Sequence, residues 1–152
     1  MAGLSFTWEL RYRGWAFCTI SDDHSRAEVT ASDVTGGPEY FLRAVTAITQ
    51  GAETAQAAFE AEPTEFRWSF RRSDSDVEIR LSKAPDRSSS DSEEIVIWSG
   101  SYSIEILARA VLDGFDDAVS GLGEENYRLQ WGRAFPHDDV EALRAAWHRI
   151  TL

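Results

Sequence analysis

Apolar and polar residues alternate along the first part of the chain, as they do in strands with one buried face. Phe6, Trp8 and Leu10 share one side of a segment whose other side is polar. This period of two residues predicts a strand. Residues 15–20 and 27–31 have related patterns, and turn-forming residues separate the segments. We therefore expect an antiparallel meander of three strands.

A helical period follows this meander. Phe41, Ala44 and Ile48 fall on one stripe at the 3.6-residue spacing of an α-helix. Pro38 suits the first turn of such a helix, and Gly51 suits its end.

The pattern then returns to strands. Residues 57–61, 66–70 and 77–81 alternate between apolar and polar positions, which predicts three more strands. The run Ile95-Val96-Ile97-Trp98 is continuously apolar, which is typical of a strand covered on both faces. Residues 84–93 have almost no apolar side chain to bury, so we expect a flexible loop there.

Three helices complete the predicted order. A long apolar stripe runs over residues 104–122, with Ser101 or Ser103 as its N-cap, and shorter helices are expected at 124–131 and after Pro136. The order is three strands, a helix, four strands and three helices. It predicts one α+β domain over residues 1–152, with helices packed on one face of an antiparallel sheet.

Charge narrows the classes of partner. The 26 acidic and 15 basic residues give a net charge of −11, which disfavours nucleic acid and anionic membrane surfaces as ligands. Such a charge serves solubility or attracts a basic partner protein. No apolar stretch reaches the roughly 18 residues that span a bilayer, and the N-terminus lacks the pattern of a signal peptide. We expect a cytoplasmic protein.

Several segments carry the residue types of catalytic or metal sites, but an ordinary structural role explains each. Asp22-Asp23-His24 has turn composition, and His137-Asp138-Asp139 places acids at the positive end of a helix. Gly36-Gly37-Pro38 lacks the spacing of a phosphate-binding loop, and Ser88-Ser89-Ser90 lacks a nucleophile-elbow pattern. Cys18 lies in an apolar run, as a buried thiol does. We predict no catalytic residue, no metal and no cofactor.

A cluster of carboxylates near residue 115 is the strongest candidate for partner binding. Asp113, Asp116 and Asp117 stand at i, i+3 and i+4 on the long helix, where like charges repel. A solvated helix face or a basic partner explains this arrangement. The following segment combines further acids with Tyr, Trp and Arg, the residue types of interface hot spots. The candidate residues are Asp113, Asp116, Asp117, Glu124, Glu125, Tyr127, Arg128, Trp131 and Arg133.

Four short segments carry a resemblance. They are Ile20-Ser21-Asp22-Asp23, Gly36-Gly37-Pro38-Glu39, Phe59-Glu60-Ala61-Glu62-Pro63 and Trp131-Gly132-Arg133-Ala134-Phe135-Pro136. Their combination resembles small conserved hypothetical proteins of actinobacteria, from which no activity or ligand carries over. In size, acidity and α+β make-up the chain is also similar to the immunity proteins of bacterial toxin systems.

Three functional hypotheses follow. The leading one is a non-enzymatic binding protein, in its most specific form an immunity-like neutraliser of a basic partner protein. The alternative is a small-molecule-binding or enzymatic domain, whose pocket between sheet and helices is lined by aromatic residues such as Trp8, Tyr12, Phe66, Trp68 and Phe70. The third is self-association through an exposed sheet edge or the last two helices.

Overall fold

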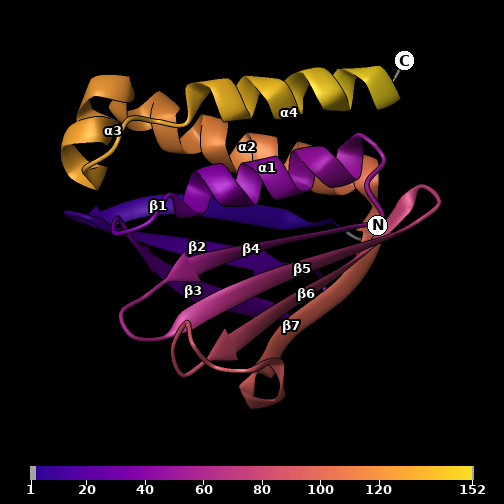
Figure 1. Cartoon of the computed structure of the whole chain (residues 1–152). Coiled ribbons are helices and arrows are strands. Elements are labelled where there is room, and N and C mark those ends of the chain that lie inside the picture. The colour runs from indigo at the N-terminus through magenta and orange to yellow at the C-terminus, as the bar shows by residue number, and fades with distance from the viewer. Residues whose placement is uncertain (1–2, 152) are drawn as a thin grey trace.

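The computed structural model describes residues 3–151, and its elements follow the predicted order. Strands and helices both contribute to the structure, so the fold class is α+β (Figure 1). The strands are β1 (Ser5–Tyr12), β2 (Trp15–Ser21), β3 (Arg26–Ser32), β4 (Thr54–Glu60), β5 (Glu65–Ser73), β6 (Asp76–Ala84) and β7 (Ile95–Ser103). The helices are α1 (Gly37–Thr49), α2 (Ile104–Leu122), α3 (Glu124–Trp131) and α4 (His137–Ile150), with a short 3-10 turn, η1 (Asp91–Glu93), before β7.

The strands form two antiparallel sheets, where we predicted one. β1, β2 and β3 make the first sheet in chain order, and β4, β5, β6 and β7 make the second. The sheets meet where the Ser32 hydroxyl donates a hydrogen bond of 3.1 Å to the carbonyl of Glu60. Alternation along a strand indicates which face is buried but not which strand is its neighbour. The division into two sheets was therefore not visible in the pattern.

The helices lie on one side of the strands, as predicted. α1 and α2 lie directly against the sheets. α4 packs across these two helices as an outer layer (Figure 1). Leu107, Val111 and Phe115 on the predicted stripe of α2 are buried. Of the two predicted N-caps, the structure has Ser103, whose Oγ accepts a hydrogen bond of 3.1 Å from the backbone N–H of Ile106.

Each of the two inner helices covers the other sheet from the one that it follows in the chain. α1 follows the three-stranded sheet but packs against β4, whereas α2 follows the four-stranded sheet but packs against β1. β4 and β1 are edge strands of their sheets. The helices can come close because glycine stands at both contacts: Gly37 lies against the ring of Phe59, and Gly114 lies against the carbonyl of Phe6.

The core between the sheets and the inner helices is largely aromatic. Trp8, Trp68 and Phe70 are buried, and their rings contact the rings of neighbouring phenylalanines. The ring centroids of Phe41 and Trp68 are 4.9 Å apart, which is close aromatic packing. The aromatic residues therefore fill the space in which the small-molecule hypothesis placed a pocket.

The prediction that the run before Trp98 is covered on both faces was wrong. Ile95 is 67% exposed, Val96 50% and Ile97 37%, and only Trp98 is buried. β7 pairs with β6 alone and forms an edge of the four-stranded sheet. A continuous apolar run is compatible with several positions in a sheet, so composition alone did not separate an inner strand from an edge.

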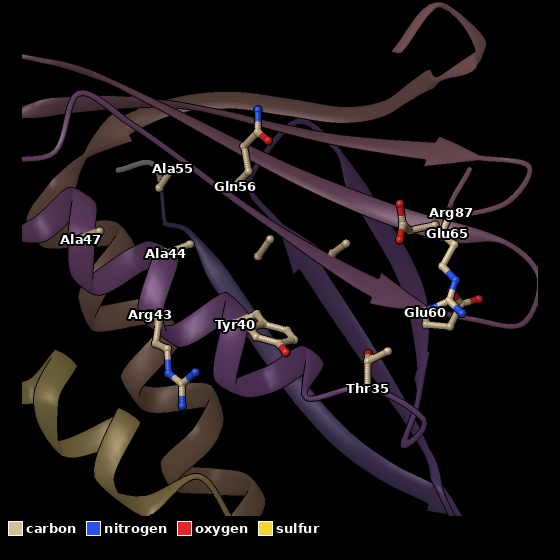
Figure 2. Close-up of a pocket in the computed structure, with 12 residues that line it drawn as sticks. Thr35, Tyr40, Arg43, Ala44, Ala47, Ala55, Gln56, Glu60, Glu65 and Arg87 are labelled. Carbon is tan, nitrogen blue, oxygen red and sulfur yellow. The ribbon is translucent and has the colours of Figure 1, made fainter. Parts of the chain in front are cut away.

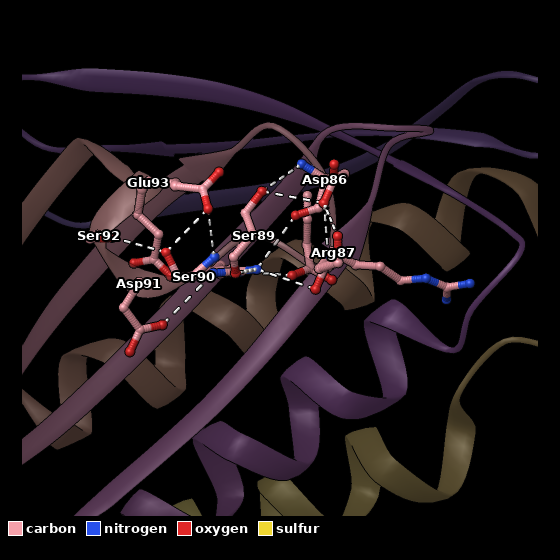
Figure 3. A network of polar contacts seen from close by, with 11 residues as sticks. Asp86, Arg87, Ser89, Ser90, Asp91, Ser92 and Glu93 are labelled. Carbon is pink, nitrogen blue, oxygen red and sulfur yellow. Dashed lines mark hydrogen bonds and ion pairs between the residues drawn. The ribbon is translucent and has the colours of Figure 1, made fainter.

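The segment predicted to be a flexible loop begins inside the sheet. Ala84 is the buried last residue of β6, and the loop itself starts after it. Hydrogen bonds run through the loop, including the one of 3.1 Å that the hydroxyl of Ser89 accepts from the backbone N–H of Asp86 (Figure 3). Arg67 of β5 donates to the carbonyl of Ser89 at 2.9 Å and to Glu94 at 2.7 Å. Flexibility of the loop stays a prediction.

Candidate functional site

Internal ion pairs engage two of the three aspartates predicted to bind a partner. Asp116 accepts two hydrogen bonds from the guanidinium of Arg144 in α4, at 2.7 and 3.1 Å. Asp113 pairs with Arg109, one turn away on α2, at 3.3 Å. Asp117 is exposed and has no ion-pair partner within residues 3–151. The cluster of three aspartates therefore offers one uncompensated carboxylate, Asp117.

Of the two glutamates at the start of α3, one has a basic partner and the other does not. Glu124 lies 3.1 Å from Nδ1 of His137, at the start of α4. Glu125 is exposed, and the described part of the chain gives it no basic partner. Arg128 is also exposed, whereas the Nε of Arg133 donates a hydrogen bond of 2.7 Å to the carbonyl of Asp33.

Tyr127 and Trp131 cannot belong to the predicted docking surface, because both are buried. The indole N–H of Trp8 donates a hydrogen bond of 2.8 Å to the hydroxyl of Tyr127, and the rings of Trp8 and Trp131 pack edge to face. Burial raises the pKa of Tyr127 above its ordinary value. Aromatic residues are common in interfaces and in cores alike, so their presence in the sequence did not separate the two.

A groove beside Asp117 brings an edge strand and the acidic helix together. It has a volume of about 320 Å³ and lies between β1 and α2. We name it the acidic groove, because its charged lining residues are Glu9, which pairs with Arg11, and the uncompensated Asp117. Its full lining is Thr7, Trp8, Glu9 and Leu10 from β1, and Gly114, Asp117, Ala118 and Leu122 from α2.

The backbone of β1 presents unpaired groups to this groove. In an antiparallel pair, residues alternate between those bonded to the partner strand and those facing away from it. The bonds from Asp22 N–H to Ser25 and from Asp33 N–H to Gly14 fix this alternation in β2. We then follow this alternation from β2 to β1 through the register of the two strands. The amides and carbonyls of Trp8 and Leu10 point away from β2 and towards the groove.

A second groove of about 500 Å³ runs between α1 and β4. We name it the alanine groove, because Ala44 and Ala47 of α1 face the strand that carries Ala55 (Figure 2). Glu60, Glu65 and Arg87 gather at one end of it (Figure 2). Its remaining lining residues are Thr35, Tyr40, Arg43, Gln56, Ala57 and Ala58.

The Asp22-Asp23-His24 segment is a turn, as expected. The carboxylate of Asp22 accepts hydrogen bonds from the backbone N–H groups of His24 and Ser25, both at 2.8 Å. It also accepts a hydrogen bond from the hydroxyl of Tyr102 at the end of β7, a contact between distant segments that no local pattern indicated. The bond from Tyr102 and the two backbone bonds lower the pKa of Asp22.

The remaining candidates for chemistry do not assemble into a catalytic group. Cys18 is buried in β2, and this burial raises the pKa of its thiol. Within residues 3–151, His, Cys, Asp and Glu side chains form no group of three that could hold a metal ion. None of the described helices combines the length and apolar composition needed to cross a membrane.

Comparison with known proteins leaves the resemblance to actinobacterial proteins a prediction. No protein-family model, no curated protein and no solved structure matches the chain. The candidate site therefore rests on the geometry of the two grooves and on the charges that line them.

Proposed function

We propose that this protein is a non-enzymatic binding protein that holds a basic, extended segment of a partner protein in the acidic groove. One observation carries the proposal: the groove combines unpaired strand backbone with two acidic side chains and no basic one, and of these Asp117 has no ion-pair partner within residues 3–151. A partner segment in extended conformation can add to such an edge through main-chain hydrogen bonds. Its Arg or Lys side chains would then pair with the carboxylates.

The charge of the whole chain supports the same class of partner. A net charge of −11 attracts basic proteins over long range and repels nucleic acid. The uncompensated carboxylates of Asp117 and Glu125 lie on consecutive helices, α2 and α3. In its most specific form, the proposal is an immunity-like neutraliser that covers a basic surface of a toxin domain inside the cytoplasm.

Labelled peptide pools test the proposal. Three pools of short capped peptides, alternating apolar residues with Arg, Gln or Glu, are titrated with the protein and followed by fluorescence anisotropy. We expect the Arg pool to bind best and its affinity to fall with added salt, because exposed charges are screened. We expect Asp117→Asn to weaken that binding about three- to tenfold, the usual scale for a partly exposed charge contact.

Two controls separate the groove from general acidity. Glu105→Gln removes one charge from an exposed position on the same helix, outside the groove, and should leave the affinity within twofold of wild type. The same Arg peptide with alternate backbone N-methylation keeps its charge but loses the donors that strand addition needs, and should bind weakly. Equal binding of all three pools, or equal losses in Asp117→Asn and Glu105→Gln, would refute the proposal.

A small-molecule-binding function has one structural feature in its favour. The alanine groove is wider than the acidic groove, and small side chains along α1 and β4 leave it open. Its aromatic lining is limited to Tyr40, so the aromatic pocket of the original hypothesis is not the site in question. A thermal-shift screen of a ligand library separates this function from protein binding, because a ligand of the native state must raise the Tm.

A further inference from the structure

The N-terminal half of β7 exposes three consecutive aliphatic side chains at the rim of a sheet. We name Ile95, Val96 and Ile97 the apolar edge. β7 has β6 on one side and, within residues 3–151, no strand on the other. Of the other edges, β4 packs against α1 and β1 packs against α2, beside the acidic groove. The apolar edge combines unpaired backbone with three consecutive exposed aliphatic side chains.

This strand lacks most of the usual protection of an edge. Natural edge strands are commonly guarded by charged residues, by proline, by a bulge or by a covering segment. β7 runs from Ile95 to Ser103 without a charged residue or a proline. It has a bulge at Ile97, which has no partner in β6 because Leu81 pairs with Trp98 and Ser82 with Val96. An edge of this composition is suited to pairing with another strand.

A second copy of the chain matches this edge better than a foreign strand does, because of where the apolar residues lie. An antiparallel pair of identical strands is self-complementary about a two-fold axis. Centring the pair on Val96 places the apolar edge of one copy opposite that of the other. It also sets Ile95 of one copy opposite Ile97 of the other, so that the centre of the pair is apolar on both sides.

The flanking charges are compatible with this arrangement. Glu94 of each copy flanks the contact, and it is already paired with Arg67 of its own chain at 2.7 Å. The centre of the contact, from Ile95 to Ile97, carries no charge.

We propose that β7 pairs antiparallel with β7 of a second copy about Val96, joining two four-stranded sheets into one continuous sheet. The contact uses neither groove, so each copy keeps its acidic groove open. The dimer and the function proposed above can therefore be tested independently, and refuting one would not refute the other.

A disulfide tests the register of the pair. Residues directly opposite in an antiparallel pair have Cβ atoms about 4.5–5.5 Å apart, so a small closure of the pair brings them to the roughly 3.5–4.5 Å of a disulfide. Two copies of Val96→Cys should therefore form an intermolecular disulfide under mild oxidation and run as a dimer on a non-reducing gel. The native Cys18 is buried and does not compete. Leu129→Cys, at an equally exposed apolar position on α3, is the matched control and should stay monomeric on the gel.

Sedimentation equilibrium tests the association itself. Wild type should have twice the mass of one chain at micromolar concentration, and Val96→Lys should have the mass of one chain. Leu129→Lys, which adds the same charge at a site 52% exposed, should remain dimeric. Far-ultraviolet circular dichroism at 25 °C checks that each variant is folded. A monomeric wild type, a dimeric Val96→Lys or equal cross-linking of both cysteine variants would each overturn the proposal.

Discussion

Gly114 is the residue at which α2 comes closest to the backbone of β1. A Cβ atom at this position would lie 2.5 Å from the carbonyl oxygen of Phe6 and 2.6 Å from its ring. Because the nearest atom belongs to the backbone, the strand or the helix would have to move. We expect Gly114→Ala to lower the free energy of unfolding by about 1–3 kcal/mol, the usual cost of overpacking. Urea denaturation measures the change.

Gly121 provides the control for this prediction. It lies on the same helix, and a Cβ atom there would meet nothing within 4 Å. Alanine is a better helix former than glycine, so Gly121→Ala should raise the free energy of unfolding by up to about 1 kcal/mol. If both substitutions changed stability in the same direction, the close contact at Gly114 would not be the cause.

The hydrogen bond from Tyr102 to Asp22 couples stability to pH at both extremes. It lowers the pKa of Asp22, and burial together with this bond raises the pKa of Tyr102 to about 12. A carboxyl group whose pKa is lowered in the folded state stabilises the fold above its unfolded pKa of about 4, and this contribution is lost as the pH falls. A tyrosine whose pKa is raised in the folded state stabilises the fold below its unfolded pKa of about 10, and this contribution is lost as the pH rises towards 12.

We therefore expect Tyr102→Phe to be less stable than wild type at neutral pH, with a difference that shrinks at both extremes. Denaturation curves from about pH 3 to about pH 11 would measure that difference. Tyr12→Phe, at a tyrosine that is 65% exposed, should not differ from wild type at any pH in this range. A loss in Tyr102→Phe that is constant with pH would contradict the assigned hydrogen bond.

At the scale of elements, one side chain of β5 fastens the segment between β6 and β7. Arg67 pairs with Glu65 and Glu94, both at 2.7 Å, and also donates to the carbonyl of Ser89. These bonds to Glu94 and Glu65 raise the pKa of Arg67. Removing the guanidinium leaves two half-buried carboxylates without a partner, so Arg67→Ala should cost about 1–3 kcal/mol.

The same substitution should release the loop. We expect trypsin to cut after the exposed Arg87 faster in Arg67→Ala than in wild type, because proteolysis follows local opening. Arg71→Ala removes a more exposed arginine of the same strand, paired with Glu78 at 3.7 Å, and should leave the rate unchanged. An unchanged rate in Arg67→Ala would mean that the loop is already open in wild type, as its composition predicts.

The elements themselves were largely visible in the sequence, whereas their neighbours were not. Buried positions such as Trp68, Val77 and Leu107 follow the periods of strand and helix, so local alternation located them. The apolar run at Ile95 was placed inside a sheet, but it lies at an edge. Which strand becomes an edge depends on pairing between distant segments, and no local pattern reports it.

For the molecule as a whole, the candidate site was partly foreseen. Asp117 was among the predicted residues and lines a groove, but the opposite wall, from Thr7 to Leu10, lies more than a hundred residues away in the sequence. Arg144 engages Asp116 from α4, a contact that charge counting along the chain cannot anticipate. One tertiary pair, Arg144 with Asp116, and one pair within the helix, Arg109 with Asp113, thus reduced the cluster of three aspartates to one available carboxylate.

α1 follows the three-stranded sheet and covers the four-stranded one, and α2 does the reverse. This arrangement has a consequence for folding during synthesis. During synthesis the three-stranded sheet and α1 leave the ribosome first, but the edge at β1 stays bare until α2, residues 104–122, has been added. In the same way, α1 has no sheet to cover until β4 has emerged. Neither half can bury its own apolar surface alone, so the nascent polypeptide is committed to its final topology only after about four fifths of its length exists.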